Sequence, residues 1–274
     1  MSYDRPDFTT PAFETTVKGI HDFTTAADRL PEGSPINVGF VENVSAADRL
    51  AAFSTLASAR LHVRPILSAR RITSETELTD LIQGIAAQHI RQVFITGGDP
   101  SEPAGPYTTA MELIRAEPLA SADLDLIGLP GFPEQHPEAT VQTLLDHLVE
   151  KVGRVESSGR RAEITTQVCL DPDAVADWIH QLRARGVAAP VRIGIPAPAT
   201  ANSLLRFCRL CKVEATREDL IRHGWMPDEV SMVADPAAFI DTLTALLTPD
   251  HGQVVVHLYP MGDVPAALDW LAEL

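Results

Sequence analysis

The stretch of this sequence best suited to chemistry is QVFITGGDP at 92–100, in which an aspartate follows two glycines. Residues 93–96 are β-branched or aromatic, which is typical of a short buried strand. Gly97 and Gly98 allow the backbone to turn sharply and another molecule to approach it closely. Asp99 then sits just past the carboxyl end of the strand, where parallel sheets and barrels collect their functional groups. The alternative is an ordinary turn in which Asp99 caps a helix.

Polar side chains of catalytic types recur at the ends of other predicted strands. The set comprises Glu14 and Lys18, Glu42 and Asn43, Glu134 and His136, Gln167, and Tyr259. Each type has an ordinary structural explanation, since an acid at a helix start interacts with the helix dipole and a buried amide satisfies backbone groups. Glu134 and His136, for example, would cap a helix that starts near Pro137. The joint occurrence of these residues at strand ends favours a ligand site.

The short motifs of several enzyme classes are missing from the sequence. Gly97 and Gly98 do not complete a GxGxxG dinucleotide motif, and neither HExxH nor a serine nucleophile elbow occurs. Cys208 and Cys211 form a CxxC, but they lie in SLLRFCRLCKV, which has the apolar spacing of a helix. No second Cys or His pair lies nearby in the sequence, so a structural role is favoured over zinc binding or redox chemistry.

The composition is that of an acidic, globular chain. Its 274 residues carry a net charge of −15 and are 45% hydrophobic, which is enough for one sizeable core. The acidic balance argues against nucleic acid or an anionic membrane as the main partner, since both require basic patches. No apolar run reaches the roughly 18 residues of a membrane span, and the N-terminus has no signal pattern. We expect a cytoplasmic protein that forms a homo-oligomer.

Short apolar runs alternate with helical patterns along the whole chain. Helix starts are indicated at Ser45, at Ser74 with Glu77, and at Asp171 followed by Pro172. Further helices are predicted at 108–114, 137–152, 203–213 and 264–271. The predicted strands are 13–19, 36–41, 61–67, 93–96, 124–129, 162–169, 191–195 and 254–258.

This alternation predicts a single barrel. Strands that alternate with helices are parallel and joined by crossovers. Eight such units predict one (β/α)8 barrel over residues 13–274, with an open, doubly wound sheet as the alternative. Residues 1–12 are predicted to form an N-terminal arm, and residues 216–247 a helical insertion before the last strand.

Four motifs of this sequence are similar to the motifs of one known family. IGLPGFPEQHPEA at 127–139 is similar to that family's "vaaYPEgHPea", and ITTQVCLDPDAVADWI at 164–179 is similar to its "ITQlffd" motif. FITGGDP at 94–100 is similar to "LRGDpp", and VHLYPMG at 256–262 to "HfYtlN". The four motifs occur in the family's order and are together far more specific than any one alone. From Phe13 to its C-terminus, the sequence therefore resembles the methylenetetrahydrofolate reductase family.

The resemblance implies a (β/α)8 barrel that reduces 5,10-methylenetetrahydrofolate to 5-methyltetrahydrofolate in one-carbon metabolism. It implies FAD at the carboxyl ends of the strands and NAD(P)H as the electron donor. Opening the five-membered ring of the folate requires a proton on a ring nitrogen. A carboxylic acid in a dry site supplies such a proton.

Individual residues take on roles through this resemblance. Asp99 and Gln167 match positions that contact the folate, and Asp99 would also stabilise the developing cation. Glu14 in FETTVK matches the catalytic acid of the family's "FEFFPPK" when one residue is deleted. The implied flavin-contacting positions are Gly98, Phe132, His136, Lys151 and Tyr259.

Other positions depart from the family's pattern on the flavin side. Gly97 stands where the family has the arginine of "LRGD", and RPILSARR replaces its "HltC" segment. Arg64, Arg70 and Arg71 are candidates to replace the missing phosphate contacts. Two alternative functions follow: an oxidoreductase without FAD that takes its hydride directly from the nicotinamide, and a non-catalytic folate-binding barrel or subunit of a C1-transfer complex.

Overall fold

The computed structural model describes residues 6–39, 44–134, 136–137 and 139–274. Two of the polar residues predicted at strand ends, Glu42 and Asn43, lie outside the described residues.

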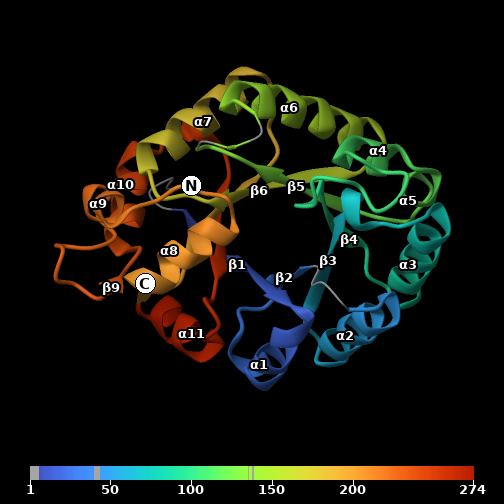
Figure 1. Ribbon diagram of the computed structural model, residues 1–274, viewed down its shortest axis with the longest axis horizontal. Helices are drawn as coiled ribbons and strands as arrows, with labels where there is room; N and C mark the ends of the chain where they lie inside the picture. Colours follow the sequence, from blue (N-terminus) through green and yellow to red (C-terminus); the bar gives the residue numbers. More distant parts are fainter. Residues whose placement is uncertain (1–5, 40–43, 135, 138) are drawn as a thin grey trace. The chain divides into compact units, whose positions relative to one another are not determined.

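Within the described residues, eight strands close into a barrel in the order β1-β10-β7-β6-β5-β4-β3-β2 (Figure 1). Pairs such as β2 with β3 and β7 with β10 run parallel, and helices separate successive barrel strands along the chain. The predicted (β/α)8 barrel is therefore confirmed. The barrel strands are β1 (Asp7–Thr16), β2 (Pro35–Gly39), β3 (His62–Ser68), β4 (Gln92–Thr96), β5 (Leu126–Gly131), β6 (Arg161–Val168), β7 (Val191–Pro196) and β10 (Val254–Tyr259).

The helices range from 4 residues in α5 to 17 residues in α6. In the described part of the chain, no helix has the length and apolar character that crossing a bilayer requires. The helices are α1 (Ile20–Thr25), α2 (Ala46–Ser58), α3 (Glu75–Ala87), α4 (Ala110–Arg115), α5 (Glu117–Ala120), α6 (Val141–Ser157), α7 (Pro172–Ala184), α8 (Ala201–Leu210), α9 (Arg217–Arg222), α10 (Ala237–Leu246) and α11 (Val264–Glu273).

The helix starts predicted from capping residues are confirmed. Ser45 accepts a hydrogen bond from the Asp48 N–H at the start of α2, and the Asp171 carboxylate caps α7. Ser74 caps α3 by accepting from the Glu77 N–H, but the Glu77 carboxylate bonds to Thr73 instead of closing a capping box with Ser74. These helix starts can be predicted from the sequence because each cap involves residues within one turn of the helix.

Two predicted boundaries are wrong. β1 begins at Asp7, so part of the expected arm belongs to the first strand, even though Pro11 cannot donate to a ladder. α6 begins at Val141 instead of Pro137, because the Thr140 side chain caps it by accepting from the Thr143 N–H. The stretch 216–247 holds α9 and α10, separated by β9 (Val233–Ala234), which pairs with β8 (Ala199–Thr200) in a small antiparallel sheet.

The chain divides into two compact units. Unit 1 comprises Met1–Ala12, Gly131–Val149 and Ile164–Leu274, and unit 2 comprises Phe13–Pro130 and Glu150–Glu163. Unit 1 buries Trp178 and Trp225 almost completely, and unit 2 does the same with Phe23 and Phe53.

A buried ion pair joins β3 to β6 within unit 2. Arg64 Nη1 donates to Glu163 Oε1 at 2.5 Å, and Arg64 Nη2 donates to Gln92 Oε1 at 2.9 Å. The two charged side chains are 2% and 7% exposed. Arg64 is therefore committed to the protein interior, and the hypothesis that it contacts a cofactor phosphate is wrong.

Removing one partner of this pair tests its contribution to stability. Glu163→Ala leaves the Arg64 guanidinium buried without its carboxylate, so we expect the free energy of unfolding to fall by about 3–5 kcal/mol. The double variant Arg64→Met/Glu163→Met removes both charges and keeps apolar volume, so it should lose less. Urea denaturation followed by circular dichroism measures both. A Glu163→Ala protein as stable as the wild type would contradict this role.

Candidate active site

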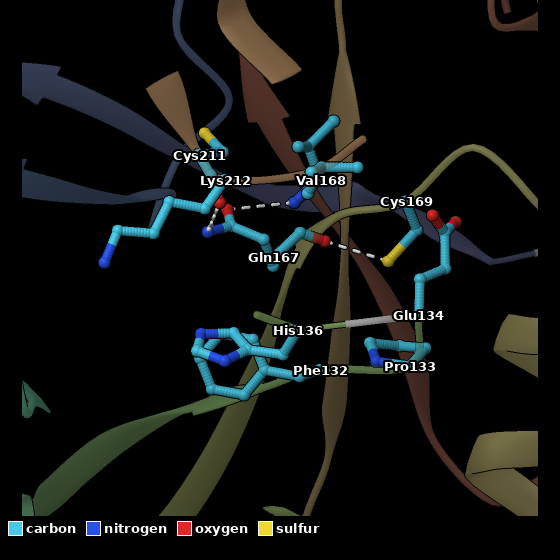
Figure 2. A pocket seen from close by; sticks show the side chains of 10 residues that line it. Phe132, Pro133, Glu134, His136, Gln167, Val168, Cys169, Cys211 and Lys212 are labelled. Atoms are coloured by element: carbon cyan, nitrogen blue, oxygen red, sulfur yellow. Dashed lines mark hydrogen bonds between the residues drawn. The ribbon is translucent and has the colours of Figure 1, made fainter. Parts of the chain in front are cut away.

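A hollow in unit 1 brings together several of the residues predicted from the sequence (Figure 2). Its empty space of about 240 Å³ includes open solvent, so little of the hollow is enclosed. The ring of His136 packs edge-on against that of Phe132, with centroids 4.9 Å apart. An aromatic wall beside polar groups suits a flat ring with polar edges. Lining residues with a chemical role to consider are Phe132, Glu134, His136, Gln167, Cys169 and Lys212.

The Gln167 amide lies on the wall of this hollow, and both its oxygen and its nitrogen make hydrogen bonds to the protein backbone. Its Oε1 accepts from the Val168 N–H at 3.1 Å, and its Nε2 donates to the Cys211 carbonyl at 3.4 Å (Figure 2). The second bond is long, so it is weak. A ligand that accepts from the amide can therefore replace the Cys211 carbonyl at little cost.

A β-bulge gives Gln167 this direction. Thr165 of β6 pairs with Arg192 of β7, but Val168 pairs with Gly194, so three steps along β6 match two along β7. The extra residue bends the strand, and bulges of this kind often re-aim a side chain beside a functional site. Gln167 lies within the bulge.

Contacts from β7 and β10 hold the bulge in place. The Thr166 hydroxyl accepts from the Gly194 N–H at 2.9 Å, and the Thr166 carbonyl accepts from the Tyr259 hydroxyl at 3.4 Å. A Cβ at position 194 would lie 2.6 Å from the Thr166 carbonyl oxygen and 2.9 Å from the Tyr259 ring. Glycine is therefore required here by close approach of the backbone.

Glu134 holds the turn that follows β6. Its Oε1 accepts from the Leu170 N–H at 2.5 Å and from the Asp171 N–H at 2.8 Å. Burial raises the pKa of the Glu134 carboxyl above its ordinary value, against the opposing effect of these two N–H groups. The expectation that Glu134 caps the next helix is wrong, because α6 starts later and the carboxylate bonds to a different loop.

Cys169 and Cys208, near the hollow, are protonated thiols in ordinary packing positions. Cys169 donates its S–H to the Gln167 carbonyl at 2.9 Å. Burial raises the pKa of the Cys169 thiol well above its usual range and that of Cys208 to about 12, which keeps both unreactive at neutral pH. Among the described residues, no three His, Cys, Asp or Glu side chains gather as a metal ion would require.

Tyr259 lies beneath α8. Its side chain is part of a residue only 7% exposed, and its ring lies 5.0 Å from that of Phe207 and 4.8 Å from that of His257. The position predicted to contact a flavin is thus covered in this structure.

The predicted residues after β4 lie in unit 2. Gly98 has a φ of +95°, a backbone conformation that favours glycine, and its neighbour Asp99 has a side chain that is 81% exposed. Arg71 Nη2 lies 3.8 Å from the Asp99 carboxylate. Arg70 donates to the carbonyls of Pro100 and Thr108, each at 3.0 Å, so it fastens the loop after β4.

Glu14 and Lys151 also belong to unit 2. Glu14 is half-buried near the carboxyl end of β1, and the register places it beside Asn37 of β2. Lys151 lies on α6, where burial lowers the pKa of its ammonium group and the neighbouring Glu150 opposes that change.

Sequence reasoning missed Lys212. This residue lines the hollow and has a φ of 58°, in the left-handed region that non-glycine residues seldom adopt. It follows Cys211, the C-cap residue of α8, and a left-handed conformation at this position commonly terminates a helix. A lysine after a helical pattern was the one available signal, and it did not indicate that the side chain would reach a hollow.

Comparison with known proteins places the chain in a family. Residues 7–268 match the family model described as methylenetetrahydrofolate reductase. The chain belongs to this family. Methylenetetrahydrofolate reductase 2 of Saccharomyces cerevisiae is 25% identical over 276 residues, covering 94% of this chain and 45% of that protein. Probable methylenetetrahydrofolate reductase (NADH) of Oryza sativa subsp. japonica is 23% identical over 212 residues, covering 72% and 35%. The chain spans less than half the length of these methylenetetrahydrofolate reductases.

The close approach at Gly194 gives a test of the bulge. Gly194→Ala drives a Cβ into the Thr166 carbonyl, so we expect the free energy of unfolding to fall by about 1–3 kcal/mol. The matched control is Gly153→Ala on the exposed side of α6, where a Cβ meets nothing within 4 Å. It should raise the free energy of unfolding by about 0.5–1 kcal/mol. Equal stability of the two variants in urea would contradict the packing described for Gly194.

Proposed function

We propose that this member of the family reduces 5,10-methylenetetrahydrofolate to 5-methyltetrahydrofolate, with NAD(P)H as the source of electrons. The observation that carries the proposal is the Gln167 amide, which a bulge directs into a hollow walled by Phe132 and His136. A pterin offers a flat ring for the aromatic wall and a polar edge for the amide. Gln167 also matches the family's folate-binding glutamine, so geometry and resemblance support the same role.

The proposed reaction moves one hydride and consumes one proton. A proton on a nitrogen of the five-membered ring opens that ring and leaves an iminium cation. Hydride addition to the methylene carbon then gives the methyl group, and NAD(P)H becomes NAD(P)+. Glu14 is proposed as the acid and Asp99 as the group that stabilises the cation, both through the family resemblance.

The residues of this chain do not fit FAD in the way that the resemblance implies. Tyr259 is buried beneath Phe207 of α8, so its ring is not available to a flavin in this structure. Of the arginines considered for the phosphates, Arg64 is buried in an ion pair and Arg70 is bonded to two backbone carbonyls. Arg71 is itself ion-paired with an acid.

These contacts favour the second candidate route, in which the hydride passes directly from the nicotinamide to the folate. Three groups considered for holding a flavin, Tyr259, Arg64 and Arg70, are engaged elsewhere in the protein, whereas the Gln167 amide is oriented and accessible on the hollow. The non-catalytic alternative predicts folate binding without NAD(P)H oxidation, and an assay separates the two.

Replacement of the proposed acid should remove turnover without removing binding. Glu14→Gln keeps the shape of the side chain but has no acidic proton to donate, so we expect kcat to fall by at least about 100-fold. Affinity for tetrahydrofolate should stay close to that of the wild type. NAD(P)H oxidation with 5,10-methylenetetrahydrofolate measures the first and calorimetry the second. The matched control is Glu156→Gln, on the exposed side of α6, and unchanged kcat in Glu14→Gln would exclude the acid role.

The absorption spectrum of the purified protein separates the two routes. Direct transfer predicts a colourless protein that ignores added FAD and still oxidises NAD(P)H in the presence of the folate. Flavin bands near ~450 nm that bleach with NAD(P)H would instead support the flavin route and contradict the preference for direct transfer.

A further inference from the structure

Glu134 and Gln167 are linked through the turn that follows β6. The turn runs through Cys169 and Leu170 to Asp171, and Glu134 bonds to its last two N–H groups. Resting on the proposed function, we propose that Glu134 is the positioning residue for the substrate-binding amide of Gln167.

Hydrogen bonds at Leu170 and Cys169 connect Glu134 to the backbone of Gln167. The Leu170 N–H donates to Glu134, while the Leu170 carbonyl accepts from the Trp225 indole N–H at 3.0 Å. Leu170 is thus fixed from two directions. Cys169, the residue before it, donates its thiol to the Gln167 carbonyl at 2.9 Å. A shift of the turn is therefore passed to the backbone of Gln167 within three residues.

The far side of the turn is equally fixed. The Asp171 N–H donates to Glu134, and the Asp171 carboxylate caps α7 by accepting from the N–H groups of Asp173 and Ala174 at 3.0 and 3.3 Å. The turn cannot relax towards α7 when Glu134 is removed without breaking this cap. The displacement is therefore expected on the Gln167 side, where the amide has the long bond to the Cys211 carbonyl.

A buried carboxylate is a costly way to hold a turn. A carboxyl group loses hydration when it is buried, and an apolar side chain in its place would avoid that loss. An apolar side chain would, however, leave two backbone N–H groups without acceptors. Glu134 satisfies both with one oxygen while its side chain lines the same hollow as Gln167 (Figure 2).

A double-mutant cycle tests the coupling of the two residues. Tetrahydrofolate affinity is measured by calorimetry for the full chain with Glu134→Ala, Gln167→Ala and both changes. We expect each single variant to bind about tenfold more weakly and the double variant to bind no more weakly than Gln167→Ala, because a displaced amide and a missing amide are equivalent. Equal loss from Glu134→Ala in the presence and absence of Gln167 would overturn the proposal.

Conservative and control variants separate positioning from general destabilisation. Glu134→Gln keeps an oxygen that accepts both N–H groups, so affinity should return to within about threefold of the wild type. Asp146→Ala removes an exposed carboxylate of α6 that pairs with Arg185, outside the turn after β6, so it should leave tetrahydrofolate affinity unchanged. If Glu134→Ala does not fold, Glu134→Asp replaces it in the cycle. The aspartate side chain is one carbon shorter, so its carboxylate lies further from the two N–H groups of the turn.

A readout without folate keeps this inference apart from the proposed function. The side-chain NH2 resonance of Gln167, assigned by its loss in Gln167→Ala, should move in Glu134→Ala and stay in place in Asp146→Ala. If Gln167→Ala leaves tetrahydrofolate affinity unchanged, the proposed function fails, and the resonance still decides whether Glu134 positions Gln167. A resonance that stays in place in Glu134→Ala would overturn the proposal.

Discussion

The two hydrogen bonds from the turn after β6 to the Glu134 carboxylate are the constraint on which the candidate site depends. A bulge removes regular ladder bonds from a strand, and buried backbone groups must then find other partners. Here side chains supply them: Thr166 for Gly194, Cys169 for Gln167, and Glu134 for Leu170 and Asp171. The irregular segment that carries Gln167 is therefore held by hydrogen bonds to side chains in place of ladder bonds.

The fixed amide has a consequence for binding. A side chain that is already oriented loses little conformational freedom when it meets its ligand, so more of the interaction energy appears as affinity. The contact that Gln167 gives up is the 3.4 Å bond to the Cys211 carbonyl at the end of α8. The same helix covers Tyr259 through Phe207. α8 thus contacts both the Gln167 amide, which is proposed to bind the folate and which α8 leaves exchangeable, and the Tyr259 ring, which the resemblance assigns to a flavin and which α8 covers.

Local signals in the sequence were sufficient for the fold. The caps at Ser45 and Asp171 act within one turn, and the alternation of apolar runs with helical patterns already implied a parallel barrel. The starts of β1 and α6 were misplaced: β1 extends back to Asp7 through the expected arm, and Thr140 instead of Pro137 sets the start of α6.

The site depended on contacts that a sequence does not display. The bulge at Gln167 is a mismatch of register between two strands. The Glu134 carboxylate accepts hydrogen bonds from the turn after β6, which is distant from it in the sequence. Arg64 was misjudged because every residue of β3 after the first is buried, so no alternation marked which side chains face inward. The family resemblance singled out Gln167, and the structure supplies the reason for its direction.

Direct hydride transfer is tested most sharply with deuterium. NAD(P)H labelled at the transferable C4 position is supplied to the full chain with 5,10-methylenetetrahydrofolate and no added flavin, and the product is examined by mass spectrometry. Direct transfer predicts 5-methyltetrahydrofolate with one deuterium in its methyl group. A methyl group without deuterium, or no 5-methyltetrahydrofolate at all, would contradict it.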